Sequence, residues 1–147
     1  YWRMREFVIS ENSGEVLNKV IKYWYLYRIK KMDAFNNASM GTNIGFGARF
    51  ESVPKFPHGL IGIIVSPYAT IGKNAYIFQQ VTIGDDGINK YNAPVIGDNV
   101  TLYAGCKIVG KCHIGNNAKI GANAVVSFDV PENAIVVCER PKVKIKQ

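Results

Sequence analysis

The chain has 147 residues, and 48 % of them are hydrophobic, which suffices for one domain with a substantial core. Its formal net charge of +7 is spread along the sequence, so the pattern argues against a basic nucleic-acid-binding stripe. The three cysteines form no CxxC pair, which argues against a disulfide framework or a zinc site and favours a reducing compartment. Because the sequence also has no signal peptide and no apolar run of membrane-spanning length, we expect a cytoplasmic protein.

Residues 1–42 are predicted to form an N-terminal helical segment. One helix is expected from about Glu15 to Met32, and residues 1–11 are expected to hold a further helical piece. Since aromatic residues and cations are mixed between residues 21 and 31, a helix lying on a membrane surface stays open as an alternative. In the main interpretation the long helix packs on the base of the following domain, with Leu17, Val20, Ile21, Trp24 and either Tyr27 or Arg28 on adjoining turns.

Residues 43–131 carry a six-residue period. From residue 65 a branched or long aliphatic residue recurs every six positions, with a small residue four places later, in blocks such as VSPYAT, IGKNAY and IGANAV. Neither a helix nor an alternating strand has this period, so the chain must turn a corner once per block. Three blocks make one triangular coil, and we predict an all-β prism of about four coils paired as parallel strands. The inward positions are Val65, Ile71, Ile77, Ile96, Leu102, Ile108, Ile114, Ile120 and Val126.

The corners of this prism are expected to depend on the repeated GxN steps. Gly72 and Asn74 belong to the first of these steps, and Gly97 and Asn99 to the second. Gly115 and Asn117 form a third step, and both residue types tolerate the positive φ that a tight corner can require.

A break in the period between residues 56 and 65 contains His58, one of the two histidines. Breaks in a solenoid are where binding and catalytic residues concentrate, so His58 is the candidate for chemistry. His113, in contrast, directly precedes Ile114 in a regular block, and we interpret it as a surface residue.

A second break is the loop 84–94, which delays the next aliphatic residue to Ile96. An excursion of this length on a solenoid usually forms a binding edge and can reach a neighbouring subunit. Asp85 and Asp86 at its start are predicted to bind substrate.

Residues 132–147 are predicted to form a basic tail. It has no acidic residue after Glu139, and its cations are Arg140, Lys142, Lys144 and Lys146. Such a tail suits a phosphate-bearing ligand, although a solvated terminus explains it equally well.

From Asn43 to about Lys142 the sequence resembles the hexapeptide-repeat acyltransferases, in particular serine acetyltransferases and bacterial polysaccharide O-acetyltransferases. The resemblance rests on the segments PHGLIGIIVSPYATIGKNAYIFQQVTIG, APVIGDNVTLYAGCKIVGKCHIGNNAKIGANAVV and DVPENAIVV. It implies a left-handed parallel β-helix, a homotrimer, acetyl-CoA as co-substrate and His58 as catalytic base. It also implies that the pantetheine arm runs over Gly84, Ala104 and Ala122, with the phosphates meeting Lys142.

Two departures from the serine-specific members bear on the acceptor. Where those members have an aspartate fifteen residues before the histidine, this chain has Asn43, which can orient an imidazole but supplies no charge. Where they have a second histidine before the Pro-x-Ile-Gly step, this chain has Ala93. The sequence therefore favours a sugar or surface-polysaccharide hydroxyl as acceptor.

Several other functions stay open beside this one. Serine O-acetylation is the alternative within the same class, as are N-acetylation of an amino-sugar nucleotide and transfer of a longer acyl chain. A trimeric scaffold without catalytic activity is the alternative from another class. A zinc-dependent carbonic anhydrase, which shares the fold, needs three histidine ligands, and two histidines cannot supply them; no metal is expected.

Overall fold

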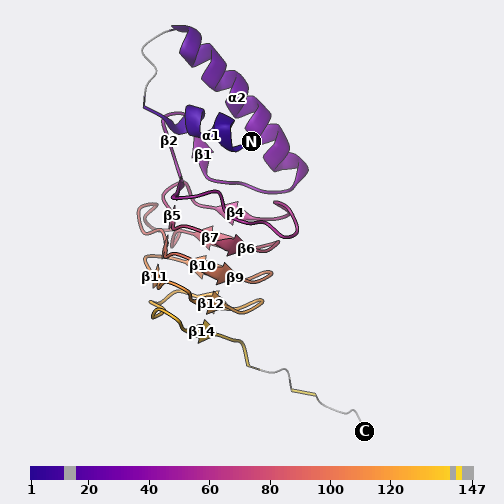
Figure 1. Cartoon of the computed structure of the whole chain (residues 1–147), viewed down its shortest axis with the longest axis vertical. Helices are drawn as coiled ribbons and strands as arrows, with labels where there is room; N and C mark the ends of the chain where they lie inside the picture. Colours follow the sequence, from indigo (N-terminus) through magenta and orange to yellow (C-terminus); the bar gives the residue numbers. More distant parts are fainter. Residues whose placement is uncertain (12–15, 140–141, 144–147) are drawn as a thin grey trace.

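The computed structural model describes residues 1–11, 16–139 and 142–143, with two helices at one end of a stack of short strands (Figure 1). The helices are α1 (Trp2–Ile9) and α2 (Val16–Phe35). They are followed by a small antiparallel sheet of β1 (Thr42–Asn43) and β2 (Phe46–Gly47). The chain then winds away from the helices, and its last strand, β14 (Ile135–Val136), lies at the far end of the stack (Figure 1).

The stack is a triangular prism with three parallel sheets of four strands each. Sheet I contains β4 (Ile64–Val65), β7 (Thr82–Gly84), β10 (Lys107–Val109) and β13 (Val125–Val126). Sheet II contains β3 (Arg49–Phe50), β5 (Thr70–Ile71), β8 (Val95–Ile96) and β11 (His113–Ile114). Sheet III contains β6 (Tyr76–Ile77), β9 (Thr101–Leu102), β12 (Lys119–Ile120) and β14 (Ile135–Val136). Successive strands from β3 onward change sheet, so the predicted corner after each hexad is confirmed.

The strand register follows the hexads. Ile108 pairs with Val126, and the two are 18 positions apart, which is three hexads and one full coil. Ile71 pairs with Ile96, 25 positions away, so the loop at 84–94 adds seven residues to its coil without shifting the register. Every aliphatic residue therefore stacks on the aliphatic residue of the next coil.

The core consists of the positions that the period predicts. Each of the nine inward aliphatic residues is at most 2 % exposed, and the small residues four places later are 5 % exposed or less. Burying one isoleucine side chain stabilises a fold by about 1.5–3 kcal/mol, so each residue of this column contributes substantially to the stability of the prism. Cys106 and Cys112 occupy two of the small positions and belong to the same core.

The asparagines of the GxN steps form a ladder along one corner. Asn74 and Asn99 have φ of 55° and 56°, as expected, and the Asn74 side-chain amide donates to Asn99 Oδ1 at 3.2 Å. The ladder continues from Asn99 to Asn117 at 3.2 Å and from Asn117 to Asn133 at 3.0 Å. Each rung joins two adjacent coils.

The glycines of these steps do not use the positive φ that they tolerate, and they have another role. A Cβ on Gly72 would lie 2.7 Å from the carbonyl carbon of Gly97 in the next coil, and Gly72 is not among the residues with positive φ. The close approach of successive coils at the corner therefore requires glycine here.

The helix α1 closes the end of the prism. The Trp2 ring stacks on Phe56 with centroids 6.1 Å apart and meets Phe50 edge-on at 5.1 Å. Arg5 is 2 % exposed and donates to the carbonyl oxygens of Met40 and Ala48. These contacts fix α1 on the first coil.

The helix α2 lies outside α1, and the face that we expected it to bury is exposed. Leu17, Val20, Trp24 and Tyr27 are each more than half exposed, because α1 rather than α2 covers the base of the prism. The buried positions of α2 lie on its other side and are Lys22, Ile29 and Asp33.

Candidate active site

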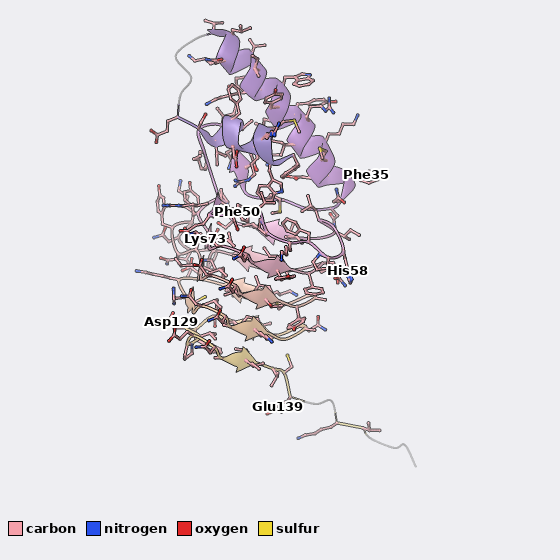
Figure 2. The ribbon with its side chains drawn as sticks, in the orientation of Figure 1. Phe35, Phe50, His58, Lys73, Asp129 and Glu139 are labelled. Atoms are coloured by element: carbon pink, nitrogen blue, oxygen red, sulfur yellow. The ribbon has the colours of Figure 1, made fainter. Side chains whose placement is uncertain are left out.

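His58 lies in the loop that leads from sheet III to sheet I. The loop leaves sheet III after Lys55, which pairs with Tyr76, and ends where β4 enters sheet I. Gly59 and Gly62 have φ of 71° and 66°, a conformation that glycine adopts freely, and they bend the loop outward. The His58 side chain is exposed on one side of the prism (Figure 2).

One hydrogen bond holds the His58 ring. Its Nδ1 lies 2.7 Å from Oε1 of Gln79, and because an amide oxygen can only accept, Nδ1 carries the hydrogen. In the neutral ring Nε2 is then the atom with the free lone pair. Gln79 is in place because its turn stacks on the His58 loop, where the Gln80 N–H donates to the Ile61 carbonyl at 2.9 Å. The arrangement suits a general base of defined tautomer.

Two aromatic rings continue from His58 along the corner between sheets III and I. The Phe78 ring meets the His58 ring edge-on with centroids 5.7 Å apart, and it stacks on Tyr103 at 5.4 Å. Aromatic pairs of this kind contribute about 0.5–1.5 kcal/mol beyond the area that they bury. His58 therefore has an apolar neighbour, Phe78, on the next coil of the prism.

Ala104 and Ala122, predicted to lie beside the pantetheine arm, follow His58 on this same corner. The Gly105 N–H donates to the Gln79 carbonyl at 3.0 Å, and the Asn123 N–H donates to the Ala104 carbonyl at 3.0 Å. The turns of three successive coils are thus joined by hydrogen bonds. Ala104 is half-buried and Ala122 is exposed, so a ligand can approach the backbone along this edge.

Gly84, Asp85 and Asp86 lie at another corner, between sheets I and II, and the two aspartates border a hollow of about 650 Å³. Asp85 accepts a hydrogen bond from the Ser66 hydroxyl at 3.2 Å. The Asp86 carboxylate accepts from the Asn89 N–H at 2.8 Å and from two further groups of the loop, and these hydrogen bonds lower its pKa. Asp86 therefore folds the loop and stays ionised, and within one chain these three residues are on a different edge from His58.

Asn43, expected to orient the imidazole, lies in β1 and pairs with Phe46 of β2. Among the described residues the His58 ring donates its hydrogen bond to Gln79, and none joins the ring to Asn43. The sequence offered one signal for Gln79 that we missed: the hexad IFQQVT places two glutamines at a corner where the other blocks carry small residues or asparagine.

His113 is on a different side of the prism from His58. It lies in β11 of sheet II, with an exposed side chain, and its backbone N–H donates to Asp129 Oδ1 at 2.7 Å. Asp129 lies on the side of the prism opposite to His58 (Figure 2). The interpretation of His113 as a surface residue is therefore confirmed.

The described part of the basic tail contains Lys142, which is exposed. Arg140, Lys144 and Lys146 lie outside the described residues.

Cysteine chemistry is unfavourable at the two core thiols, because burial raises the pKa of Cys106 to about 12 and also raises that of Cys112.

Within residues 1–11, 16–139 and 142–143 no three His, Cys, Asp or Glu side chains gather as a metal site would require. No helix in these ranges has the length and hydropathy needed to cross a membrane.

Comparison with known proteins relates this geometry to one group of enzymes. Residues 93–127 match the family described as bacterial transferase hexapeptide (six repeats). Over 98 residues the chain is 40 % identical to the serine acetyltransferase of Staphylococcus aureus strain Mu50, a match that covers 66 % of this chain and 46 % of the relative.

Solved structures are similar over more of the chain. Serine acetyltransferase isoform 3 from Entamoeba histolytica, in complex with cysteine, has a TM-score of 0.72 at 26 % identity and covers 86 % of this chain and 46 % of that one. A serine acetyltransferase in complex with CoA has a TM-score of 0.66 at 30 % identity, and the match covers 82 % of this chain and 47 % of that one. The chain spans about half the length of these proteins. The repeat, the three parallel sheets and these matches show that the chain folds as a left-handed parallel β-helix, and it is similar to the hexapeptide transferases and to the serine acetyltransferases.

Proposed function

We propose that this chain is the catalytic part of an acetyl-CoA-dependent O-acetyltransferase in which His58 is the general base. The observation that carries the proposal is the hydrogen bond between His58 Nδ1 and Gln79 Oε1, because it leaves Nε2 free to accept a proton. The serine acetyltransferases among its relatives and the CoA in one similar structure support acetyl-CoA as the donor.

The reaction needs no covalent intermediate on the protein. His58 Nε2 takes the hydroxyl proton as the acceptor oxygen attacks the acetyl carbonyl carbon. When the tetrahedral intermediate collapses, the C–S bond breaks, the ester is released, and the imidazolium returns its proton to the CoA thiolate. Throughout, Gln79 accepts from Nδ1–H, and this hydrogen bond strengthens when the ring is charged.

The edge below His58 is the proposed path of acetyl-CoA, past Ala104 and Ala122, with Lys142 near its phosphates. Gly84, Asp85 and Asp86 lie on a different edge of the same chain and would meet that path only from a neighbouring prism. We therefore propose a trimer in which each site combines the His58 edge of one subunit with the 84–94 loop of the next.

Comparison with known proteins favours L-serine as the acceptor over the sugar hydroxyl expected from the sequence. The sugar interpretation rested on Asn43 and Ala93. Ala93 is 7 % exposed and packs in the core, so its side chain is not a surface group that selects an acceptor. Gln79, in turn, occupies the orienting position that Asn43 was expected to fill.

The test is thiol release from acetyl-CoA with L-serine, galactosides and oligosaccharide repeat units as separate acceptors. We expect His58→Ala to lower kcat at least about a hundredfold with little change in acetyl-CoA affinity, since general bases contribute about 10² to 10⁴ in rate. His113→Ala is the matched control and should behave like the wild type.

Three results would contradict the proposal. A folded His58→Ala variant that keeps most of its activity would remove His58 from the mechanism. Loss of activity in His113→Ala would move the site to sheet II. A folded, acetyl-CoA-binding protein that releases no thiol with any acceptor would favour the scaffold without catalytic activity.

A further inference from the structure

The outer face of α2 is apolar and has no partner within the described chain. Val16, Val20, Tyr23 and Tyr27 recur at spacings of four and three residues, so they line one side of the helix. Leu17, Trp24 and Phe35 lie next to this line. All seven side chains are more than half exposed, and Phe35, labelled in Figure 2, is 90 % exposed at the C-terminal end of the helix.

On an ordinary surface helix the apolar residues face the protein and the charged residues face water, and on α2 this arrangement is reversed. Its inner face, against α1, holds the buried charged residues Lys22 and Asp33. Lys22 donates to the Ser10 carbonyl, and Asp33 accepts from the Tyr1 hydroxyl at 2.6 Å. Seven neighbouring exposed apolar residues on one helix mark an interaction site, whereas isolated exposed apolar residues are ordinary on a protein surface.

The exposed charges of α2 have a single sign. Its exposed cations are Lys19, Arg28, Lys30 and Lys31, and Asp33, the one acidic residue of α2, is buried. A second copy of this face would bring the same cations and no exposed acidic residue, so the charges oppose pairing of two α2 helices. They complement an anionic surface instead.

A hollow of about 510 Å³ at the C-terminal half of α2 points to the kind of anionic surface. It is lined by Tyr27, Met32 and Phe35 together with Arg28 and Lys31. Apolar side chains beside two cations match a lipid, whose phosphate lies next to the start of its acyl chains. Tyr and Trp are also the residues that prefer the boundary between lipid headgroups and acyl chains.

We propose that α2 binds the surface of a membrane that contains anionic lipids, with the helix lying in the interface. The aromatic and aliphatic side chains of the outer face enter the headgroup region, and the cations contact lipid phosphates. Because α2 lies across one end of the molecule, the prism then projects from the membrane with its His58 corner in water (Figure 2).

The experiment is sedimentation of the chain with vesicles of phosphatidylcholine, with and without phosphatidylglycerol, at several salt concentrations. We expect binding to the mixed vesicles that weakens with salt, and a blue shift of tryptophan emission from Trp24 entering the interface. Lys30→Gln with Lys31→Gln should lower the partition coefficient about 25-fold, since each cation near an anionic surface contributes about fivefold. Lys73→Gln with Lys119→Gln, two exposed lysines on the prism, is the matched control.

A second pair of variants tests the apolar part. Trp24→Ser with Tyr27→Ser should abolish binding, whereas Tyr91→Ser, an equally exposed aromatic residue in the 84–94 loop, should not. Circular dichroism and the unfolding midpoint establish that each variant is folded. The proposal is overturned if the wild-type chain binds neither kind of vesicle, binds both equally, or instead forms a dimer that the Trp24 variant abolishes.

Discussion

The contact between His58 and Gln79 predicts how activity responds when the orienting residue is changed. Gln79→Leu keeps a side chain of similar size but removes the oxygen that lies 2.7 Å from Nδ1. A hydrogen bond to a neutral group contributes about 0.5–1.5 kcal/mol and one to a charged group about 1.5–3 kcal/mol. The hydrogen bond therefore favours the transition state, in which the ring is becoming charged, by about 1–1.5 kcal/mol more than the resting state, so kcat should fall about five- to tenfold.

Gln79→Glu tests the same contact in the opposite direction. A carboxylate in place of the amide favours the protonated imidazole, so the acid limb of the pH–rate profile should move to higher pH by about one unit or more. The chain then needs a higher pH before the base is free, and full activity should return above that limb.

The assay is the pH dependence of kcat and of kcat/KM for thiol release, measured for wild type, Gln79→Leu, Gln79→Glu and the control His113→Ala. A purely structural role for Gln79 would lower activity equally at every pH. If Gln79→Glu has the wild-type profile, or if Gln79→Leu is as active as the wild type, the imidazole is not positioned by Gln79 in the working enzyme.

Three further predictions concern the ligand edge, the corner ladder and the core. Ala104→Trp should weaken acetyl-CoA binding at least about tenfold in calorimetry without changing the circular dichroism spectrum, because this half-buried position borders the proposed pantetheine path; unchanged affinity would disprove that path. Asn99→Ala removes two ladder hydrogen bonds and places alanine at φ 56°, so the free energy of unfolding in urea should fall by about 2–4 kcal/mol. A decrease below about 0.5 kcal/mol would refute the role of the ladder. Burial raises the pKa of Cys106 from 9.0 to about 12, so the unfolded chain loses this proton first and stability should fall as pH rises from about 9 to 12. This decrease in stability with pH should be smaller in Cys106→Ala. In the native protein, iodoacetamide at pH 8 should label the exposed Cys138 but not the buried Cys106.

The sequence by itself determined the prism. A period of six residues is compatible with a triangular coil and with neither a helix nor a flat sheet, so the inward column from Val65 to Val126 could be read directly from the spacing. The break that contains His58 was visible for the same reason, because an insertion interrupts a strict period. His113 could be set aside because its block is regular.

The tertiary structure alone decided the contacts between coils and the orientation of the helices. Gln79 reaches His58 across 21 positions of sequence because coil stacking brings their two turns together, and no local pattern encodes that pairing. Gly72 is required by the close approach of Gly97, which also belongs to the next coil. The pattern of α2 predicted that its apolar side would be buried, but the structure buries the side with Lys22, Ile29 and Asp33 instead. The choice followed from α1, which occupies the end of the prism and leaves the aromatic face of α2 exposed.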